Sequence, residues 1–212
     1  MTAEQKDKRL FVSTIILVVV HVAGIIGILS PYKDSFLILT PLNLLVSITL
    51  LFWNHKDFSN SFNVFCVLTF IIGFTVEWIG VHTKLLFGHY TYGEVLGPKI
   101  LDIPVIIGVN WLMLIYSVGV VCNKINTNAF VKSFIGAAAL VLLDLFIEPV
   151  AMKYNFWNWF EGAPSIRNFI DWFIIAFLLL LLFNALKFNK NNALAKALLI
   201  VQLIFFVTLS FL

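Results

Sequence analysis

Seven long apolar runs set the hydrophobic pattern of this chain, and short polar clusters separate them. Each run has about the 20 residues that an α-helix needs to cross the hydrocarbon layer of a membrane. The pattern therefore predicts an all-α, polytopic transmembrane helix bundle of about seven helices. The second run contains Pro41 and Asn43, which makes it the least regular, and we expect Pro149 to end the fifth helix. The runs cover residues 10–29, 35–53, 62–81, 102–121, 130–149, 168–186 and 193–211.

The composition excludes an ordinary soluble domain. Of the 212 residues, 61% are hydrophobic and only 12% are charged, with a mean hydropathy of +0.99, whereas soluble domains are about half apolar and about a quarter charged. The chain contains no visible internal repeat, and we expect residues 1–212 to form a single integral membrane domain. Cys66 and Cys122 lie in apolar runs without a CxxC motif, so we interpret them as small buried residues and predict no metal site.

Positive charges predict how the chain is oriented in the cell membrane. Nine of the fourteen Lys and Arg residues lie at the N-terminus or in the loops after the second, fourth and sixth runs. Because such charges favour the cytoplasmic side, we predict a multi-pass protein with its N-terminus in the cytoplasm. The same charges are topology signals in short loops, so we predict no nucleic-acid partner. The first run has no A-x-A cleavage site and is expected to stay attached as a membrane helix.

Two polar segments interrupt the apolar pattern, at about residues 77–111 and 144–172. They contain the loops after the third and fifth runs, which lie on the same side of the membrane if each run crosses it once. Glu77 lies near the end of the third run, and Asp144 and Glu148 lie near the end of the fifth. We therefore expect all three carboxyl groups to reach one membrane face at a similar depth.

These three carboxyl groups are the predicted catalytic residues. Charged side chains inside a membrane are costly and usually serve ion movement or acid–base chemistry. Asp144 and Glu148 are four residues apart on one helix face, where two ionised carboxylates would repel each other. Gly73 and Gly80 flank Glu77 on nearly one face, which predicts close helix packing around it.

Aromatic side chains accompany the acids, and this narrows the chemistry. A carboxylic acid can donate its proton to an alkene, and aromatic faces can stabilise the carbocation that forms. A second carboxylate can accept a proton from water. The pattern favours protonation of an alkene followed by capture of the carbocation. The residues predicted to stabilise the cation or to pack against it are Tyr90, Tyr92, Trp111 and Trp157.

Some of these polar and aromatic residues also have ordinary structural interpretations. Trp157 and Trp159 are typical of an aromatic belt at the membrane surface. Asp102 could cap a helix that begins with the fourth run. Arg167 could pair with an acid of the fifth helix or face lipid headgroups.

Two sets of motifs carry a resemblance to a known family. The first set reads Glu77-Trp78-x-Gly80-Val81-x-Thr83, Phe87-Gly88-x-Tyr90-x-Tyr92, Leu96-Gly97-Pro98 and Pro104. The second set reads Asp144, an acidic residue before Pro149 and Ala151, Trp157-x-Trp159, Gly162-x-Pro164 and Asn168-Phe169-x-x-Trp172. In order and spacing these motifs resemble the CruF-type carotenoid biosynthesis membrane proteins, over roughly residues 70–175. The chain has Thr83-Lys84 where the family often has Thr-Gly, and Glu148-Pro149 where it often has Asp-Pro.

The resemblance implies a carotenoid 1,2-hydratase, a hydro-lyase that needs no cofactor. Such enzymes add water to the terminal C1=C2 double bond of an acyclic ψ end group, as in lycopene, γ-carotene or bisanhydrobacterioruberin. The implied partners are a lipid-soluble carotenoid and membrane lipid, and contacts with other carotenoid-pathway enzymes stay open. With this resemblance, the predicted substrate-binding residues are Thr83, Tyr90, Tyr92, Asp102, Asn110, Trp111, Trp157, Trp159, Arg167, Asn168 and Trp172.

Two alternative functions stay open at this point. A carotenoid end-group cyclase would use the same protonation step but would trap the cation with a neighbouring double bond. A small proton-coupled membrane transporter would also contain intramembrane carboxyl groups. Transporters usually place polar residues at the membrane midplane in matching broken helices, and the acids here gather near one face instead.

Overall fold

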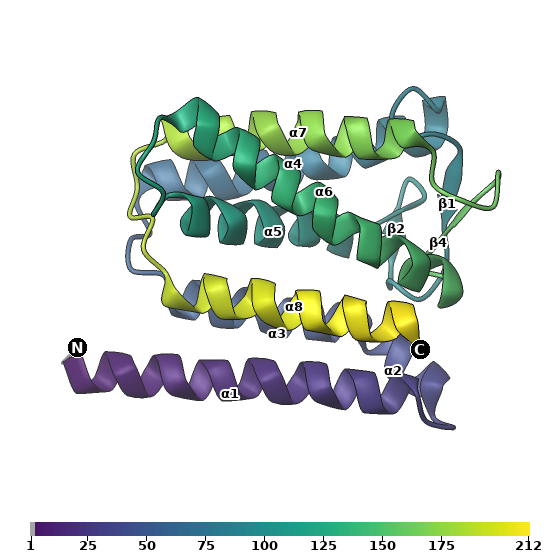
Figure 1. The fold of residues 1–212 in the computed structure, drawn as a ribbon, viewed down its shortest axis with the longest axis horizontal. Coiled ribbons are helices and arrows are strands. Elements are labelled where there is room, and N and C mark those ends of the chain that lie inside the picture. Colours follow the sequence, from purple (N-terminus) through teal and green to yellow (C-terminus); the bar gives the residue numbers. More distant parts are fainter. Residues whose placement is uncertain (1–2) are drawn as a thin grey trace.

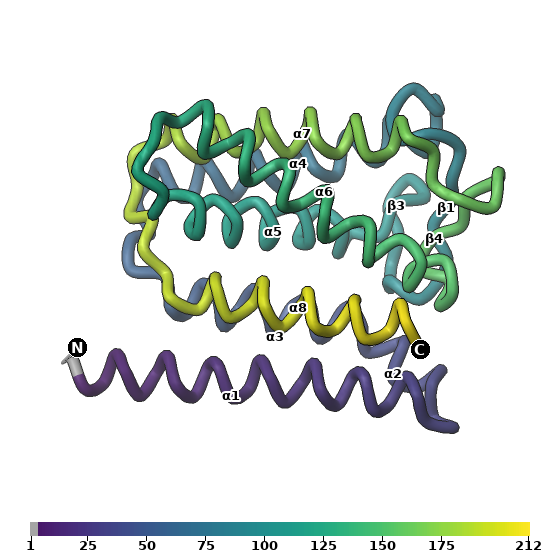
Figure 2. Tube along the Cα trace, in the orientation of Figure 1, coloured from purple at the N-terminus to yellow at the C-terminus, as the bar shows by residue number. Residues whose placement is uncertain are grey.

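The computed structural model describes residues 3–212, and helices make up most of the fold (Figure 1). The long helices lie along the long axis of the molecule, and the two termini lie at opposite ends of it (Figures 1 and 2). The helices are α1 (Ala3–Ile28), α2 (Lys33–Ile38), α3 (Thr40–Trp53), α4 (Asn60–Thr83), α5 (Ile106–Cys122), α6 (Ala129–Lys153), α7 (Ile166–Ala185) and α8 (Ala193–Phe211). The strands are β1 (Tyr90–Tyr92), β2 (Lys99–Ile100), β3 (Ile103–Pro104) and β4 (Trp157–Trp159).

Within residues 3–212, five helices are long and apolar enough to cross a membrane, namely α1, α4, α6, α7 and α8. Helices α3 and α5 are also apolar but have only 14 and 17 residues. At about 1.5 Å per residue they are shorter than the roughly 30 Å hydrocarbon layer. The predicted all-α fold is therefore confirmed, and the chain is a multi-pass membrane protein, but the predicted count of about seven membrane helices is not confirmed.

The second apolar run is divided into two helices. Helix α2 ends and α3 begins around Leu39, and Pro41 lies in the first turn of α3. Proline lacks the backbone N–H that a continuing helix would need, whereas the first turn of a new helix leaves that group unpaired in any case. Pro41, which makes this run irregular in the sequence, therefore lies beside the point where the run divides into two helices.

Helix α5 begins at Ile106 instead of residue 102, because a short hairpin precedes it. Strands β2 and β3 pair antiparallel, and the two turn residues Leu101 and Asp102 have φ values of 49° and 63°. Positive φ at both positions is the geometry of a tight two-residue hairpin turn. The interpretation of Asp102 as the cap of this helix is therefore wrong.

Helix α6 continues through Pro149 to Lys153, so the prediction that Pro149 ends it is also wrong. A proline inside a helix deprives one carbonyl, here that of Leu145, of its usual N–H donor. The next turn is held by packing instead, since Val150 and Ala151 are fully buried. Burial of these apolar side chains offsets the lost hydrogen bond.

Helix α5 is the central element of the bundle. Most of its residues are buried, and it contacts α3, α4, α6, α7 and α8. A helix that is apolar on all sides is expected to be covered on all sides. Near the start of α5, Trp111 is 1% exposed and its neighbour Asn110 is partly buried.

Strands β1 and β4 join the two polar segments. They pair antiparallel, with Tyr90 opposite Trp159 and Tyr92 opposite Trp157. Because alternate residues of a strand point to the same face, the four aromatic side chains share one face of this two-stranded ribbon. The loops that we predicted to share one side of the membrane are thus in direct contact.

Candidate active site

Three buried carboxyl groups lie together beneath the β1–β4 ribbon. Glu77 on α4 is 4% exposed, and Asp144 and Glu148 on α6 are 1% and 3% exposed. Glu77 and Glu148 line the same small chamber, and Asn168 on α7 connects Glu148 to Asp144. Buried acids are stable only with hydrogen-bond partners, so the partners of each group define what it can do.

Glu77 accepts three hydrogen bonds. The hydroxyl groups of Tyr90 and Tyr92 donate to its Oε2 at 2.5 and 2.7 Å. The indole N–H of Trp111 donates to its Oε1 at 2.9 Å. An ionised carboxylate is an acceptor only, and several donors stabilise its charge. Glu77 is thus surrounded by groups that suit a negative charge.

The two tyrosines of β1 act as fixed donors to this carboxylate. Burial, followed by the negative charge of Glu77, raises the pKa of both Tyr90 and Tyr92 well above their usual value of 10.0. Both phenols therefore keep their protons at neutral pH and far into the alkaline range. An ionised Glu77 therefore has both tyrosine hydroxyl groups as hydrogen-bond donors over that whole pH range.

Two glycines allow these donors to approach Glu77, as the sequence suggested. A Cβ on Gly73 would lie 2.5 Å from the Cβ of Trp111, and a Cβ on Gly80 would lie 2.9 Å from the hydroxyl of Tyr90. Both distances are too short for any larger residue. The spacing Gly73, Glu77, Gly80 therefore leaves room on one helix face for the two side chains that bind the acid between them.

We expect Gly73→Ala to destabilise the protein. Its new methyl group would meet Trp111 at the root of the side chain, which cannot rotate away, and overpacking of this kind costs about 1–3 kcal/mol. Thermal unfolding in detergent would measure the loss. Gly24→Ala is the matched control, because its methyl group would meet only the edge of the Phe205 ring, at 3.2 Å. Equal unfolding temperatures for the two variants would contradict the prediction.

Glu148 also accepts three hydrogen bonds, whereas Asp144 accepts one. Trp157 and Trp159 donate from their indole N–H groups to Oε2 of Glu148 at 3.0 and 2.7 Å. The Asn168 amide donates at 3.1 Å to Oε1 of Glu148 and at 3.1 Å to Oδ2 of Asp144. No described residue bonds the buried Oδ1 of Asp144. Asp144 is therefore much less suited than Glu148 to carry a negative charge.

Aromatic rings surround a small chamber between Glu77 and Glu148. Its volume is about 30 Å³, which is enough space for at least one water molecule. Trp172 stacks on Trp111 with a centroid separation of 4.1 Å and closes one wall. The other lining residues are Phe87, Tyr90, Tyr92, Ile107, Asn110, Trp157, Trp159 and Asn168.

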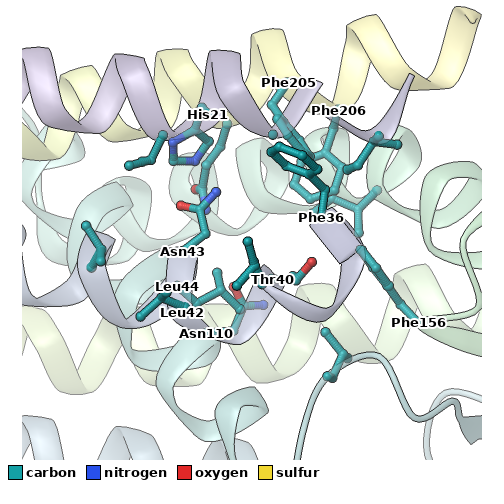
Figure 3. Close-up of a pocket in the computed structure, with 18 of the residues that line it drawn as sticks. His21, Phe36, Thr40, Leu42, Asn43, Leu44, Asn110, Phe156, Phe205 and Phe206 are labelled. Carbon is teal, nitrogen blue, oxygen red and sulfur yellow. The ribbon is translucent and has the colours of Figure 1, made fainter. Parts of the chain in front are cut away.

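A larger apolar cavity of about 270 Å³ adjoins the chamber. Its walls come from α1, α3, α5 and α8, with single residues from α2, α6 and the loops (Figure 3). Three residues, Ile107, Asn110 and Trp157, line both spaces. An apolar ligand in the large cavity would therefore lie next to two buried carboxyl groups.

Eight of the eleven predicted substrate-binding residues line the chamber, and three lie outside it. Thr83 is exposed and donates to a carbonyl of its own helix at 2.6 Å. Asp102 is exposed and lies 3.2 Å from His82. Arg167 lies 3.4 Å from Asp171, the residue one turn later on α7. The eight that line the chamber are Tyr90, Tyr92, Asn110, Trp111, Trp157, Trp159, Asn168 and Trp172.

The start of α7 holds the loop that follows α4. Asp171 accepts a hydrogen bond from the backbone N–H of Phe87 at 2.7 Å, and Ser165 donates to the carbonyl of Phe87 at 3.2 Å. Arg167 donates to the carbonyl of Leu85. These contacts hold Phe87 at a φ of 64° and place its ring in the chamber wall. Arg167 and Asp171 thus shape the site from outside it.

Sequence reasoning missed the contribution of the flanking helices. The large cavity is lined by His21 on α1, Asn43 on α3 and Gln202 on α8 (Figure 3 labels the first two). These helices look like generic apolar sequence, and the motifs all lie between them. The available signal was the presence of single polar residues in apolar membrane helices, which usually face the protein interior.

Comparisons with known proteins found a family and a relative that are similar to this chain. A protein-family model described as "Carotenoid biosynthesis protein" matches residues 36–212. The chain is similar to a bisanhydrobacterioruberin hydratase from Haloarcula japonica, with 28% identity over 123 residues. The similar region covers 54% of this chain and 42% of the relative's length. No solved structure matches the chain.

Proposed function

This chain belongs to the carotenoid biosynthesis protein family, and from that premise we propose that it is a carotenoid 1,2-hydratase. It adds water across the terminal C1=C2 double bond of an acyclic end group, as in lycopene or γ-carotene. One observation carries the proposal: an apolar cavity of about 270 Å³ adjoins a small chamber that has room for water and is lined by two buried carboxyl groups. Hydration of an alkene requires this combination of an apolar site, an acid, a base and one water.

The acid in this proposal is the pair formed by Asp144 and Glu148. Both accept a hydrogen bond from the same Asn168 amide, and two carboxylates held this close in a buried site cannot both be ionised. The pair therefore holds one proton. It rests on Asp144, which is the less suited of the two to a negative charge, and moves to Glu148 for delivery, because Glu148 lines the chamber and is bonded to Trp157, which also lines the large cavity.

Proton transfer to C2 uses the π electrons of the alkene and leaves a tertiary cation at C1. The ring of Trp157 lies at the junction of the two spaces and can stabilise this cation through its face. The negative charge of Glu77 provides further electrostatic stabilisation from the chamber. Both groups are positioned before the reaction begins.

Water capture completes the reaction, with Glu77 as the base. The oxygen of the water forms a bond to C1 while Glu77 accepts one of its protons, which leaves a tertiary hydroxyl group on the product. After one reaction Glu77 carries an extra proton and the Asp144–Glu148 pair lacks one. A proton must therefore pass from Glu77 back to the pair before the next turnover. No cofactor is required for any of these steps.

The proposed substrate is a long polyene dissolved in the membrane. The cavity of about 270 Å³ is at the lower limit of pockets for drug-sized ligands, which are about 300–1,000 Å³. It therefore accommodates one end of a carotenoid while the remainder lies in lipid. The ribbon and the N-terminus lie at opposite ends of the molecule (Figure 1), so a cytoplasmic N-terminus would place the chamber towards the outer face of the cell membrane.

We expect Ala23→Trp to weaken substrate binding. Ala23 lines the cavity from α1, so an indole there would displace about 50 Å² of substrate contact, worth roughly 1.3 kcal/mol or about a tenfold higher KM. Val22→Trp is the matched control, because Val22 is exposed and does not line the cavity. Steady-state hydration assays in detergent micelles would compare the two. A normal KM in Ala23→Trp would argue against this cavity as the substrate site.

Expression in lycopene-producing cells tests the function directly. The expected result is a more polar pigment whose mass exceeds that of lycopene by one water, resolved by chromatography and mass spectrometry. A new pigment of unchanged mass would mean cyclisation and would overturn the proposal. The absence of any new pigment from lycopene and γ-carotene, with the protein present in the membrane, would count equally against it.

A further inference from the structure

We propose that Asn110 positions the water that captures the carbocation, an inference that rests on the proposed hydration. Asn110 lines both the chamber and the apolar cavity. No hydrogen bond joins its side-chain amide to any other residue in the described range 3–212. It is therefore a free polar group at the junction between the space for water and the space for the alkene.

The placement of Asn110 on α5 explains this position. Ile107, Asn110 and Leu114 lie on one face of the helix, and all three line the apolar cavity. The polar amide thus interrupts an apolar wall. The next residue, Trp111, donates to Glu77, so the same turn of α5 holds the proposed base and presents the amide beside it.

Most other polar side chains of the chamber already use a donor group on one of the two acids. Six of them donate to Glu77 or Glu148, namely Tyr90, Tyr92, Trp111, Trp157, Trp159 and Asn168. Trp172 offers only an indole N–H. Asn110 differs from them in that its whole amide, the oxygen acceptor included, makes no hydrogen bond to the described residues, and it also lines the apolar cavity.

A neutral acceptor has a defined use in this reaction. A water that attacks C1 must direct a lone pair at the carbon and its two hydrogens elsewhere. Glu77 accepts one hydrogen and later the proton, and the Oδ1 of Asn110 accepts the other. The chamber of about 30 Å³ has room for a water held between these two acceptors, and this orientation leaves its oxygen facing the cavity.

Loss of this orientation should change the fate of the cation, not its formation. Without a positioned water, the cation can lose a proton again, from C2 or from a neighbouring methyl group, or it can be trapped by a neighbouring double bond. Loss from C2 regenerates the original alkene, and loss from a methyl group gives an isomer with the double bond moved outward. In D₂O the first route leaves deuterium at C2 of recovered substrate, because the hydrogen added there came from solvent.

The experiment compares the full-length protein and its Asn110→Leu, Asn110→Asp and Asn110→Ser variants in D₂O, with lycopene as the probe. The measured quantity is the ratio of hydrated product to lycopene that carries deuterium at C2. Wild-type protein is expected to give hydrated product with little deuterated lycopene. Asn110→Leu is expected to lower this ratio at least tenfold, while Asn110→Asp, which keeps an oxygen acceptor, restores most of it.

The ratio of hydrated product to deuterated lycopene does not depend on the amount of folded protein. A variant that is partly unfolded therefore still gives a valid ratio. A parallel loss of hydration and deuterium exchange in Asn110→Leu would overturn the inference, because Asn110 would then act before the cation forms. The same conclusion would follow if neither Asn110→Leu nor Asn110→Ser gave hydration or exchange. A wild-type protein that gives no hydrated product would instead refute the proposed function itself.

Discussion

Replacing Glu77 with Gln is expected to lower the hydration rate by about 10²–10⁴-fold, the usual contribution of a positioned acid–base group. Gln has nearly the same volume and can still accept the hydrogen bond of Trp111. It carries no negative charge to stabilise the cation, and it cannot take the proton of the attacking water. Kinetic assays with matched amounts of membrane-embedded protein would measure the loss.

Glu94→Gln provides the matched control for this substitution. Glu94 lies in the same polar segment, but its side chain is 89% exposed and pairs with Lys99 at 2.7 Å. Its replacement removes a surface charge pair, which contributes little, and should leave the hydration rate unchanged. Full activity in Glu77→Gln, or an equal loss in both variants, would remove Glu77 from the mechanism.

Replacing Glu148 with Gln is the second change with a large expected effect. It removes the group that delivers the proton, so the combined rate at which hydrated product and C2-deuterated lycopene form in D₂O should fall by about 10²–10⁴-fold. Asp144→Asn should also lower the rate, but by less, because Asp144 does not line the chamber and reaches it only through Glu148 and Asn168. Deuterium incorporation in D₂O would distinguish this loss from a defect in water capture.

Glu161→Gln is the control for the Glu148 substitution, since Glu161 is an exposed residue just after β4. It should retain wild-type rates of hydration and exchange. The rate of deuterium addition at C2 is counted in hydrated product and recovered lycopene together. If Glu148→Gln kept the wild-type value of this rate, protonation would have to come from another residue. The assignment of acid and base would then have to be reversed, with Glu77 as the proton donor.

Local sequence features predicted the all-helical membrane class of this protein and marked the carboxyl groups at the centre of its candidate site. Runs of apolar residues have a length that a membrane dictates, so the helical bundle follows from composition and spacing alone. A carboxyl group inside such a run is costly, which marks Glu77, Asp144 and Glu148 without knowledge of their neighbours. The glycines beside Glu77 can also be recognised from the sequence, because helical spacing places them on the same helix face as Glu77.

Helix ends were less predictable than helices. Pro149 was expected to stop α6, but buried packing of the following turn outweighs one lost backbone hydrogen bond. Asp102 resembled a helix cap, yet it lies in a hairpin turn at positive φ. In both cases a local rule competed with contacts made by residues elsewhere in the chain.

By itself, the sequence determined a membrane bundle with an acidic, aromatic site between residues 77 and 172. Only the tertiary structure decided that β1 pairs with β4, so that two tyrosines bind Glu77 and two tryptophans bind Glu148. It also decided that α1, α3 and α8 enclose the apolar cavity, and that Asn110 stands at its junction with the chamber. The physical reason is that helical periodicity and the free-energy cost of a carboxyl group in a membrane can both be read within one segment of the sequence. The contacts named here join segments that lie far apart in the chain.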